Sequence, residues 1–466
     1  HRYGERGPPA TLGPEKTQLE PHLAGNAPRV DGGSKSKKMP RRASPVRGGI
    51  LGSMLDETST SETTPEIVIV GAGPGGALLA HILLSQGIRV TLIERQKDFA
   101  REFRGEAVMP SGVAAFETAG LGDLLVETPT KRPNAIELYY RGRKAARIDF
   151  RDVGDSGPVI VSQPDLLEAL IERCSQKPGF RFLRGTAVSE LSSEGGRING
   201  VVTNEGDRYP ASLVIGTDGR GSIVRRRAGL HLEESTEAFD IVWFKCPYPE
   251  SLVERGSPAM ASVGGGHLYL SYLAATGQMQ MASVIPKGSF PEIRKRGLDA
   301  WFDEIRLGIP AEVGDFALAH RDQITDPFVL SVVCHMLPRW TVPGALLLGD
   351  AAHPMSPVGG QGINIALRDV VVAANQLVPV LRAGGGAAAI DAACAQVEQL
   401  RIPEAAKVQR FQRIPPRVLF RGRWWSEALI RLVLMLAGSG LPQASGRLPG
   451  VVRMLLYGDG EVKLEL

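Results

Sequence analysis

Residues 66–76 read Glu66-Ile-Val-Ile-Val-Gly-Ala-Gly-Pro-Gly-Gly76. The apolar run is typical of a buried parallel strand, and the glycine spacing that follows is typical of a turn leading into a helix. In such a turn Gly71 permits the tight bend, Gly73 lets the backbone approach a pyrophosphate, and Gly76 allows helix and strand to pack closely. The free N–H groups of the next helix favour phosphate. The stretch therefore predicts a dinucleotide-binding turn.

A second strand is expected at residues 89–93, and Glu94 stands at its end, 23 positions beyond Gly71. A carboxylate at this place can accept hydrogen bonds from ribose hydroxyls. Gly75 and Arg95 complete the candidate nucleotide-binding residues of this strand–turn–helix–strand unit.

Another glycine-rich stretch occurs near residue 350. Leu346-Leu-Leu-Gly-Asp350 reads as a buried strand ending in Gly-Asp, and Pro357-Val-Gly-Gly-Gln-Gly362 follows it. Asp350 can accept hydrogen bonds from ribityl hydroxyls, and the glycines leave room for a flat ring. A helix from about Ile363 would direct its positive end at that ring, where a reduced flavin carries negative charge. Two turns that fit opposite ends of one cofactor indicate FAD rather than a freely exchanging nicotinamide.

Two shorter motifs have open interpretations. In Gly216-Thr-Asp-Gly-Arg220, Asp218 can cap a helix starting near Ser222 or order a loop near the pyrophosphate, and Arg220 can attract a nicotinamide nucleotide's phosphates. A plain turn with a basic helix face explains this pattern equally well. Arg104, in Phe103-Arg-Gly-Glu106, could contact a phosphate or a ribityl hydroxyl, or form a surface ion pair with Glu106.

Metal and disulfide chemistry is not expected. The four cysteines form no close pair, which favours a reducing, cytoplasmic environment. Asp350 and His353 have a spacing that would suit a metal pair, but no third ligand accompanies them.

Charge is concentrated at the amino end. Residues 1–53 hold ten Lys/Arg and four acids, a formal charge of +6. Because the whole chain has a formal charge of +4, the remaining residues carry −2 and are close to neutral. Bulk charge therefore gives no argument for nucleic-acid binding. Residues 1–60 are predicted to be a disordered basic extension that need not be native, with a functional basic tail as the alternative.

The blocks at 71–76 with Glu94, at 216–220, and at 349–354 with 357–364 together resemble the class A flavoprotein monooxygenases, the para-hydroxybenzoate hydroxylase fold, over residues 65 to about 410. The resemblance implies FAD, a transiently visiting NADH or NADPH as hydride donor, and transfer of one oxygen atom from O2 to an electron-rich carbon.

The resemblance also assigns roles to individual residues. Arg104 and Gln163 match FAD contacts, and Val188 matches a backbone contact to adenine. Asp350 would meet the ribityl chain or pyrophosphate, and Asp218 and Arg220, with Arg104, match positions tied to FAD and NAD(P)H. The residues expected to line the flavin ring are Pro357, Gly360, Gln361, Gly362 and Asn364.

The fold class expected is α/β, with a Rossmann-like FAD-binding domain, an interleaved β-sheet substrate domain and C-terminal helices. The FAD-binding domain is predicted at 65–236 and 325–410, the substrate sheet at 237–324, and the C-terminal helical segment at 411–466. The sheet-like pattern at 238–284 would roof a substrate cavity.

The expected substrate is aromatic or conjugated and lipophilic, such as a phenol, quinolone, quinone precursor or polyketide of secondary metabolism, and it would be hydroxylated or epoxidised. No residue is singled out as the substrate's base; His267, Tyr269 and Tyr272 are candidates, each also explained by strand packing. Reduction of prenyl chains, flavin-dependent halogenation and a flavin-binding sensor are the alternatives. Trp424-Trp425 does not fit the halogenase signature Trp-x-Trp-x-x-Pro.

The C-terminal segment raises the question of a membrane. No window of 18 uncharged apolar residues occurs, and the apolar stretch at 428–437 is short and interrupted by Arg431. Neighbouring arginines and tryptophans could mark a membrane-surface element. A helix packed on the domain is the favoured interpretation, and the protein is expected to be cytoplasmic, with peripheral membrane contact as the alternative.

Overall fold

The computed structural model of the chain describes residues 66–100, 106–152, 157–232, 237–413, 424–438, 454, 456–458 and 462–466. They all belong to one compact unit that spans Glu62–Leu466. Two predictions, the disordered extension at 1–60 and the role of Arg104, lie outside the described residues.

The first sheet confirms the predicted Rossmann-like unit. Its strand order is β18-β19-β12-β1-β2-β8, and all neighbours except β18 and β19 run parallel. Ile67–Val70 are buried on both sides of the sheet, which explains their continuous apolar run. The strands are β1 (Glu66–Val70), β2 (Arg89–Glu94), β8 (Phe180–Arg184), β12 (Leu213–Gly216), β18 (Thr341–Val342) and β19 (Ala345–Leu347).

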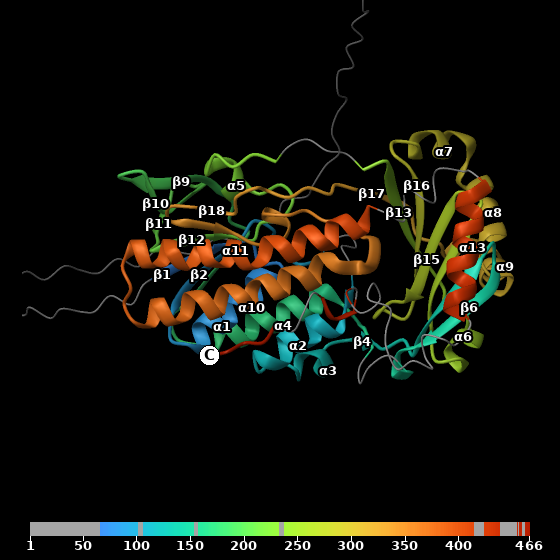
Figure 1. The fold of residues 1–466 in the computed structure, drawn as a ribbon, viewed down its shortest axis with the longest axis horizontal. Coiled ribbons are helices and arrows are strands. Elements are labelled where there is room, and N and C mark those ends of the chain that lie inside the picture. The colour runs from blue at the N-terminus through green and yellow to red at the C-terminus, as the bar shows by residue number, and fades with distance from the viewer. Residues whose placement is uncertain are drawn as a thin grey trace, which may run out of the picture. The chain divides into compact units, whose positions relative to one another are not determined.

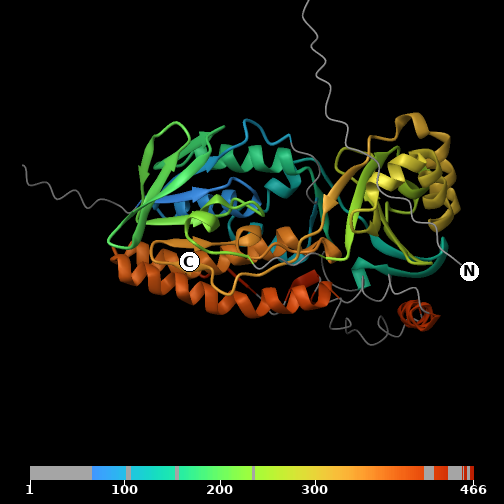
Figure 2. The same cartoon turned by 90° about the horizontal axis from the view of Figure 1, so that it is seen from above.

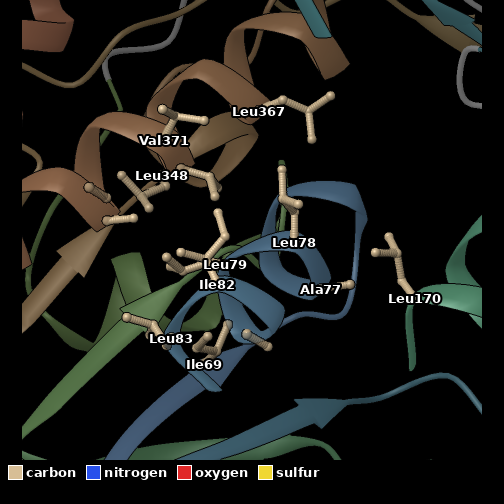
Figure 3. Close-up of a cluster of buried hydrophobic side chains, with 14 of the residues drawn as sticks. Ile69, Ala77, Leu78, Leu79, Ile82, Leu83, Leu170, Leu348, Leu367 and Val371 are labelled. Carbon is tan, nitrogen blue, oxygen red and sulfur yellow. The ribbon is translucent and has the colours of Figure 1, made fainter. Parts of the chain in front are cut away.

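Helices cover this sheet and enclose its core. Figure 1 shows the long α10 and α11 side by side, with α1 next to α10 and α4 next to α1. Leu78, Leu79 and Ile82 of α1 interlock with Leu367 and Val371 of α10 in a fully buried cluster (Figure 3). The helices of this part are α1 (Pro74–Ser85), α2 (Pro110–Thr118), α3 (Leu124–Glu127), α4 (Gln163–Ser175), α5 (Ile223–Arg227), α10 (Gln361–Arg382) and α11 (Ala387–Gln412).

Among the described helices, one stretch, Val358–Arg382, is long and apolar enough to cross a membrane by composition alone. Of its most apolar window, 61% is buried inside the protein. It contains α10, so its apolar character is explained by its place in the core.

A second, seven-stranded sheet has the order β17-β13-β16-β15-β14-β5-β6. The chain enters it twice, because β5 and β6 come well before the other five strands in sequence. Only β14 and β5 pair in parallel. The strands are β5 (Ala135–Tyr140), β6 (Arg143–Asp149), β13 (Phe239–Cys246), β14 (Ala259–Gly264), β15 (His267–Leu273), β16 (Met279–Pro286) and β17 (Phe328–Ser331).

This sheet has two different sides. On the first, Val242, Phe244 and Met281 pack against Trp301 and Phe302 of the helices that cover it, so we call it the helix-covered side. Figure 2 shows these helices, drawn in yellow to orange, along one side of the sheet. They are α7 (Phe290–Arg296), α8 (Leu298–Gly308) and α9 (Ala311–Ala319), with α6 (Glu250–Glu254) nearby in sequence.

On the second side, Ile241, Trp243 and Val284 form a buried cluster with Val358, which belongs to the glycine loop at 357–362. We call this the loop-facing side. Side chains alternate between the two sides along each strand, so strand position decides which side a residue faces. The sheet thereby presents an apolar surface to the loop predicted to hold a flavin ring.

Smaller elements complete the fold. One three-stranded sheet has the order β11-β10-β9 and another the order β3-β7-β4. Their strands are β3 (Ala107–Val108), β4 (Thr130–Lys131), β7 (Val159–Val161), β9 (Val188–Glu194), β10 (Arg197–Thr203) and β11 (Arg208–Pro210). The 3₁₀ turns are η1 (Phe150–Asp152), η2 (Arg321–Gln323), η3 (Gly349–Ala351) and η4 (Val358–Gly360).

The C-terminal helix α13 (Trp424–Gly438) packs against β5 and β6. Tyr140 hydrogen-bonds to Glu427, and the Arg431 guanidinium lies 4.8 Å from the Tyr140 ring centroid. Leu432, Val433 and other apolar side chains of this helix are exposed. Packing on the domain, the favoured interpretation, is observed; contact with a membrane stays a prediction.

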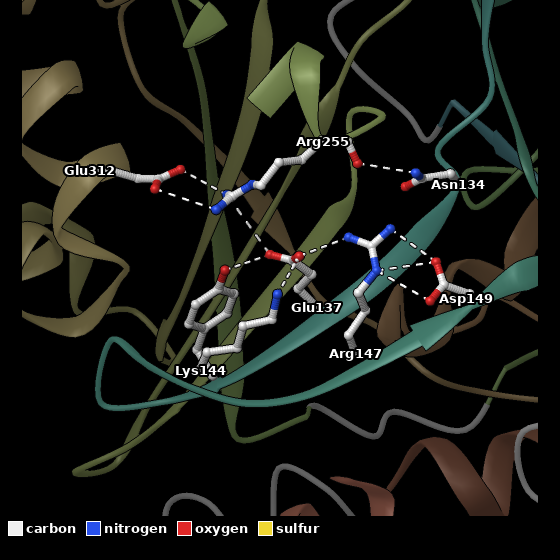
Figure 4. A network of polar contacts seen from close by, with 8 residues as sticks. Asn134, Glu137, Lys144, Arg147, Asp149, Arg255 and Glu312 are labelled. Carbon is white, nitrogen blue, oxygen red and sulfur yellow. Dashed lines mark hydrogen bonds and ion pairs between the residues drawn. The ribbon is translucent and has the colours of Figure 1, made fainter. Parts of the chain in front are cut away.

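A buried carboxylate links several side chains near the β6 edge of the seven-stranded sheet (Figure 4). Glu137 is fully buried and accepts hydrogen bonds from Tyr139, Lys144 and Arg147 at 2.5–2.9 Å. Arg255 lies 3.9 Å from the same carboxylate and pairs with Glu312. Burial opposes ionisation of Glu137, but the hydrogen bonds from Lys144, Tyr139 and Arg147 outweigh it and lower its pKa to about 2.

Replacing Glu137 with Gln should destabilise the protein by about 3 kcal/mol at pH 7, because it removes the charge from a fully buried side chain that Lys144 and Arg147 contact from partly exposed positions. A folded-state pKa below the ordinary value of 4.5 contributes stability above pH 4.5, and this contribution is lost as the pH falls toward 2. The wild-type advantage, measured by urea unfolding, should therefore shrink over that range. Glu304→Gln, which breaks an exposed pair with Arg296, should change stability by less than about 0.5 kcal/mol. Equal stability of wild type and Glu137→Gln at pH 7 would contradict the account of this network.

Candidate functional site

The predicted nucleotide turn lies where β1 ends and α1 begins. Gly71 has φ +103°, and a Cβ there would lie 2.6 Å from the Thr217 carbonyl oxygen. A Cβ on Gly76 would collide with the Gly71 carbonyl, and one on Gly75 would touch Val370 of α10 at 3.5 Å. Around Gly73, by contrast, nothing lies within 4 Å of an added Cβ. Gly71 and Gly76 are needed for packing, a Cβ on Gly75 would make an ordinary contact, and Gly73 borders open space at the start of α1.

Glu94 ties the turn to the end of β2. Its buried carboxylate accepts hydrogen bonds from the backbone N–H groups of Ala72 and Gln96, both at 2.9 Å. These two bonds orient the Glu94 carboxylate at the end of β2. Arg95, the next residue, is exposed.

Asp218 lies beside the turn and caps α5. Its carboxylate accepts the Ser222 hydroxyl at 2.5 Å and the Ile223 N–H at 2.6 Å. Burial raises the pKa of Asp218 against the opposing effect of these hydrogen bonds. The helix-capping interpretation is therefore what the structure shows. Thr217, to which no sequence motif assigned a role, donates its hydroxyl to the Gly71 carbonyl at 2.7 Å.

Asp350 lies in η3, directly after β19. Its half-buried carboxylate is 3.3 Å from Nε of Arg220, whose guanidinium also donates to the Ser331 carbonyl. Arg225 of α5 donates to the backbone carbonyls of Ala351 and Arg220, at 2.8 and 2.6 Å. The 216–220 block and the Gly-Asp turn are thus joined by direct contacts.

A cluster of buried charged side chains contacts the Gly-Asp turn. Asp369 accepts the Gly349 N–H at 3.1 Å, lies 2.6 Å from Nε2 of His353, and pairs with Arg401 at 2.7 Å. Burial raises the pKa of Asp369, but His353 and Arg401 hold it below the ordinary value. His353 therefore acts here as a partner of Asp369. Among the described residues, no group of three metal-ligating side chains occurs.

The glycine loop turns sharply into α10. Gly359 and Gly360 have φ of +78° and +64°, a backbone region that favours glycine. Gln361 is buried and donates to the Gly359 carbonyl at 3.0 Å, while Pro357 is half-buried. A Cβ on Gly362 would meet nothing within 4 Å. Like Gly73, Gly362 borders open space in the first turn of a helix.

Asn364 fixes this loop to β3. Its side chain donates to the carbonyls of Gly360 and Ala107, at 2.8 and 3.3 Å, and accepts the Met109 N–H at 2.8 Å. The amide therefore makes three contacts within the protein. Gln163 begins α4, shortly after the strand β7 that pairs with β3, and Val188 begins β9 and is buried.

The two predicted ends of the site lie close together. β1, β12 and β19 are neighbours in the parallel sheet, so the turns at Gly71, Thr217 and Gly349 share its carboxyl edge. Gly75 faces Ala366 and Val370, which lie five and nine residues beyond the first residue of α10. At 1.5 Å per residue, the starts of α1 and α10 are therefore offset by about 8–14 Å along the α10 axis. One extended dinucleotide can reach both helix starts.

The three candidate substrate bases lie on different sides of the seven-stranded sheet. Tyr269 belongs to the cluster on the helix-covered side, and His267 stacks on it with ring centroids 5.8 Å apart. Tyr272 packs with the cluster on the loop-facing side, 6.5 Å from the Trp243 ring. Only Tyr272 of the three faces the loop. Burial raises the pKa of Tyr272, and Glu106 raises it further.

The chain is similar in sequence to several known proteins. A family model described as "FAD binding domain" matches residues 64–408. The 6-methylpretetramide 4-monooxygenase of Streptomyces rimosus is 31% identical over 407 residues, which are 86% of this chain and 94% of that enzyme. The 3-amino-4-hydroxybenzoate 2-monooxygenase of Streptomyces cremeus is 30% identical over 74% of this chain and 85% of its own.

Solved structures share the fold. The p-nitrophenol 4-monooxygenase PnpA of Pseudomonas putida DLL-E4 matches with a TM-score of 0.70 at 20% identity, over 84% of this chain and 98% of that one. PqsL of P. aeruginosa, solved with 2-aminobenzoylacetate, matches with a TM-score of 0.69 at 21% identity, over 78% and 99% of the two chains.

Proposed function

We propose that this chain, which belongs to the FAD-dependent class A flavoprotein monooxygenases, hydroxylates a polycyclic aromatic substrate of the polyketide type and takes its hydride from NADH or NADPH. The observation that carries the substrate class is the likeness to 6-methylpretetramide 4-monooxygenase, which extends over 94% of that enzyme. The apolar loop-facing side, with Ile241, Trp243 and Leu270, supports it, because a large flat substrate can lie against such a surface.

The residues present fit FAD. Gly73 and Gly362 leave open space in front of the helices that start at Pro74 and Gln361, and helix starts favour anionic groups. The α1 start would bind the pyrophosphate, and the α10 start would face the negative side of the flavin ring. When bound, FAD supplies both the acceptance of hydride and the activation of O2.

Other residues would hold the remaining parts of the cofactor. The Glu94 carboxylate at the end of β2 would accept hydrogen bonds from ribose hydroxyls, and Asp350 would accept from the ribityl chain. The loop contacts of Asn364 would act indirectly, by fixing the position of Gly360. The further residues proposed to contact FAD are Gly71, Gly75, Gly76, Arg95, Gln163, Val188, Asp218, Pro357 and Gln361.

The hydride donor would approach past Arg220. This side chain is about one third exposed and pairs with Asp350 at the surface of the site. A guanidinium at this place can attract the phosphates of NADH or NADPH without holding them permanently, as a transient visitor requires.

The sheet supplies a dry enclosure for oxygen transfer. Trp243, Val284 and Phe239 are at most 5% exposed, and the partly buried Val358 of the glycine loop packs against their cluster. Excluding water protects reactive oxygen species from unproductive decay. The chain's own contribution is therefore to orient the substrate and keep solvent away.

Turnover with aromatic substrates tests the proposal. Purified protein with FAD should consume O2 and NADH or NADPH faster when a polyhydroxylated polycyclic aromatic is added, and the product should gain one oxygen atom by mass. NAD(P)H oxidation with stoichiometric release of peroxide and no oxygenated product, across a panel of phenols and polyketide-type aromatics, would contradict the proposed function.

A further inference from the structure

On the loop-facing side, the neighbouring strands β13, β16 and β15 carry apolar side chains except in one row. Lys245 stands opposite Gln280, and Gln280 stands opposite Tyr272, on the neighbouring strands β13, β16 and β15. Directly opposed residues in an antiparallel sheet point to the same side. The next row on this side is apolar and contains Trp243 and Ala282. A polar row therefore borders the surface against which the substrate is proposed to lie.

Glu106 approaches this row from the other part of the fold. Its carboxyl group interacts electrostatically with Lys245 and with Tyr272. Its backbone carbonyl accepts the Val161 N–H at 2.8 Å, and the next residue begins β3, the strand that Asn364 ties to Gly360. Glu106 is thus attached to the part of the fold that carries the glycine loop, and its charge acts on the polar row.

Two acceptors at this place lack donors. Within the described part of the chain, Oε2 of Glu106 and Oε1 of Gln280 are buried and have no hydrogen-bond partner. The Gln280 amide nitrogen donates to the Phe244 carbonyl at 3.2 Å, which fixes the orientation of the amide group. Buried acceptors without donors cost free energy, so a ligand that brings donors to both would be bound selectively.

We propose that Glu106 and Gln280 form the polar end of the substrate pocket and bind an aromatic edge that carries two hydroxyl groups, with Glu106 acting as the base for one of them. The inference rests on the proposed function, since it names the substrate group that the site takes. The O–H bond of the substrate breaks, its proton passes to the Glu106 carboxylate, and the electron pair stays on the substrate oxygen. The neighbouring Lys245 ammonium balances the phenolate charge.

Ionisation of the substrate serves the reaction. A phenolate pushes electron density into its ring, which makes the ring carbon more reactive toward an electrophilic oxygen atom. Burial raises the pKa of Glu106 to about 7, with Lys245 opposing the shift. A base with a pKa near the working pH can both accept and release a proton efficiently.

The test uses the FAD-loaded full chain with 1,4-dihydroxyanthraquinone, whose colour changes on ionisation, and 1,4-dimethoxyanthraquinone, which has no donors. Wild type should bind the dihydroxy compound at least about tenfold more tightly than the dimethoxy compound. Glu106→Gln and Gln280→Leu should each lose most of this preference. Ser283→Ala, on the helix-covered side of the same strand as Gln280, should keep it.

The pH dependence separates a base from a structural residue. With wild type, the ionised fraction of the bound dihydroxy compound should fall as the pH falls through about 7, because Glu106 becomes protonated and no longer accepts the proton. Glu106→Gln should show no such step. Wild-type preference and a wild-type pH step in Glu106→Gln would overturn the proposal.

FAD content and O2 consumption are measured in parallel. All three variants should retain FAD, because none of the changed residues is assigned to the cofactor. Binding of the two probes is read without turnover, so a wild type that consumes no O2 would overturn the proposed function while the probe preference still decides the role of Glu106.

Discussion

Gly73→Asp should weaken FAD binding by at least about 100-fold, equivalent to about 2.7 kcal/mol. The substitution places a carboxylate in the open space at the start of α1, where the negatively charged pyrophosphate is proposed to lie. Like charges repel, and the side chain occupies the volume that the phosphates need. The fold itself should survive, because φ of −69° and ψ of 178° suit any residue and aspartate is a favourable helix cap. FAD titration followed by flavin fluorescence measures the effect.

Gly386→Asp is the matched control. Gly386 precedes α11 with φ of −71° and ψ of 176°, and nothing lies within 4 Å of an added Cβ. The two positions therefore share their backbone conformation, their helix-capping role and their open surroundings. The control should keep wild-type FAD affinity. Equal FAD affinity of Gly73→Asp and Gly386→Asp would remove the phosphate-binding role of the first turn.

Gly362→Val should lower oxygenation at least about 100-fold, because misplacing reacting groups by about 1 Å can cost that much in rate. The added side chain enters the open space in front of α10, where the flavin ring is proposed to lie, and would displace the ring from its oxygenation geometry. FAD binding should weaken less than in Gly73→Asp, since the pyrophosphate contacts at α1 remain. Product formation per NAD(P)H consumed, together with FAD affinity, checks both expectations.

Ala388→Val is the matched control for Gly362→Val, because it also places a β-branched residue at the second position of a helix. Ala388 is exposed in α11, and the change touches neither proposed end of the cofactor. Its oxygenation rate should stay within about twofold of wild type. If Gly362→Val formed product as fast as Ala388→Val, the ring could not lie against the start of α10.

The amino-terminal unit was predictable because its signals are local. The strand at 66–70, the glycine spacing and the helix that follows are all contained within about 20 residues, and the structure confirms them as β1 and α1. The entry of residues 135–149 into the substrate sheet was not predictable in the same way. That pairing joins segments more than a hundred residues apart, β5 with β14, and strand register leaves no local sequence signal.

The residues of the candidate site also differ in whether the sequence alone predicts them. The glycines with a positive φ or a close backbone contact were predictable from sequence, because such positions favour glycine. The alternatives for Asp218 could not be separated, because its capping of α5 depends on the placement of Ser222 and Ile223 around the carboxylate. Glu106 and Gln280 carried no sequence signal for substrate binding, since they belong to segments far apart in the chain and their relation depends on the tertiary fold.

Some expectations stay predictions. The domain boundaries and the individual cofactor contacts are not tested by the fold, and Arg104 and the basic extension lie outside the described residues. The assignment to the monooxygenases favours oxygenation over prenyl reduction and halogenation.

The central claim is that the starts of α1 and α10 hold opposite ends of a single FAD. A crystal structure of the chain with FAD bound tests it most directly. The account predicts one FAD per chain, with its pyrophosphate hydrogen-bonded to backbone N–H groups next to Gly73 and its flavin ring against Gly360 and Gly362. A flavin ring bound away from the glycine loop, or a pyrophosphate without contact to the α1 start, would contradict it.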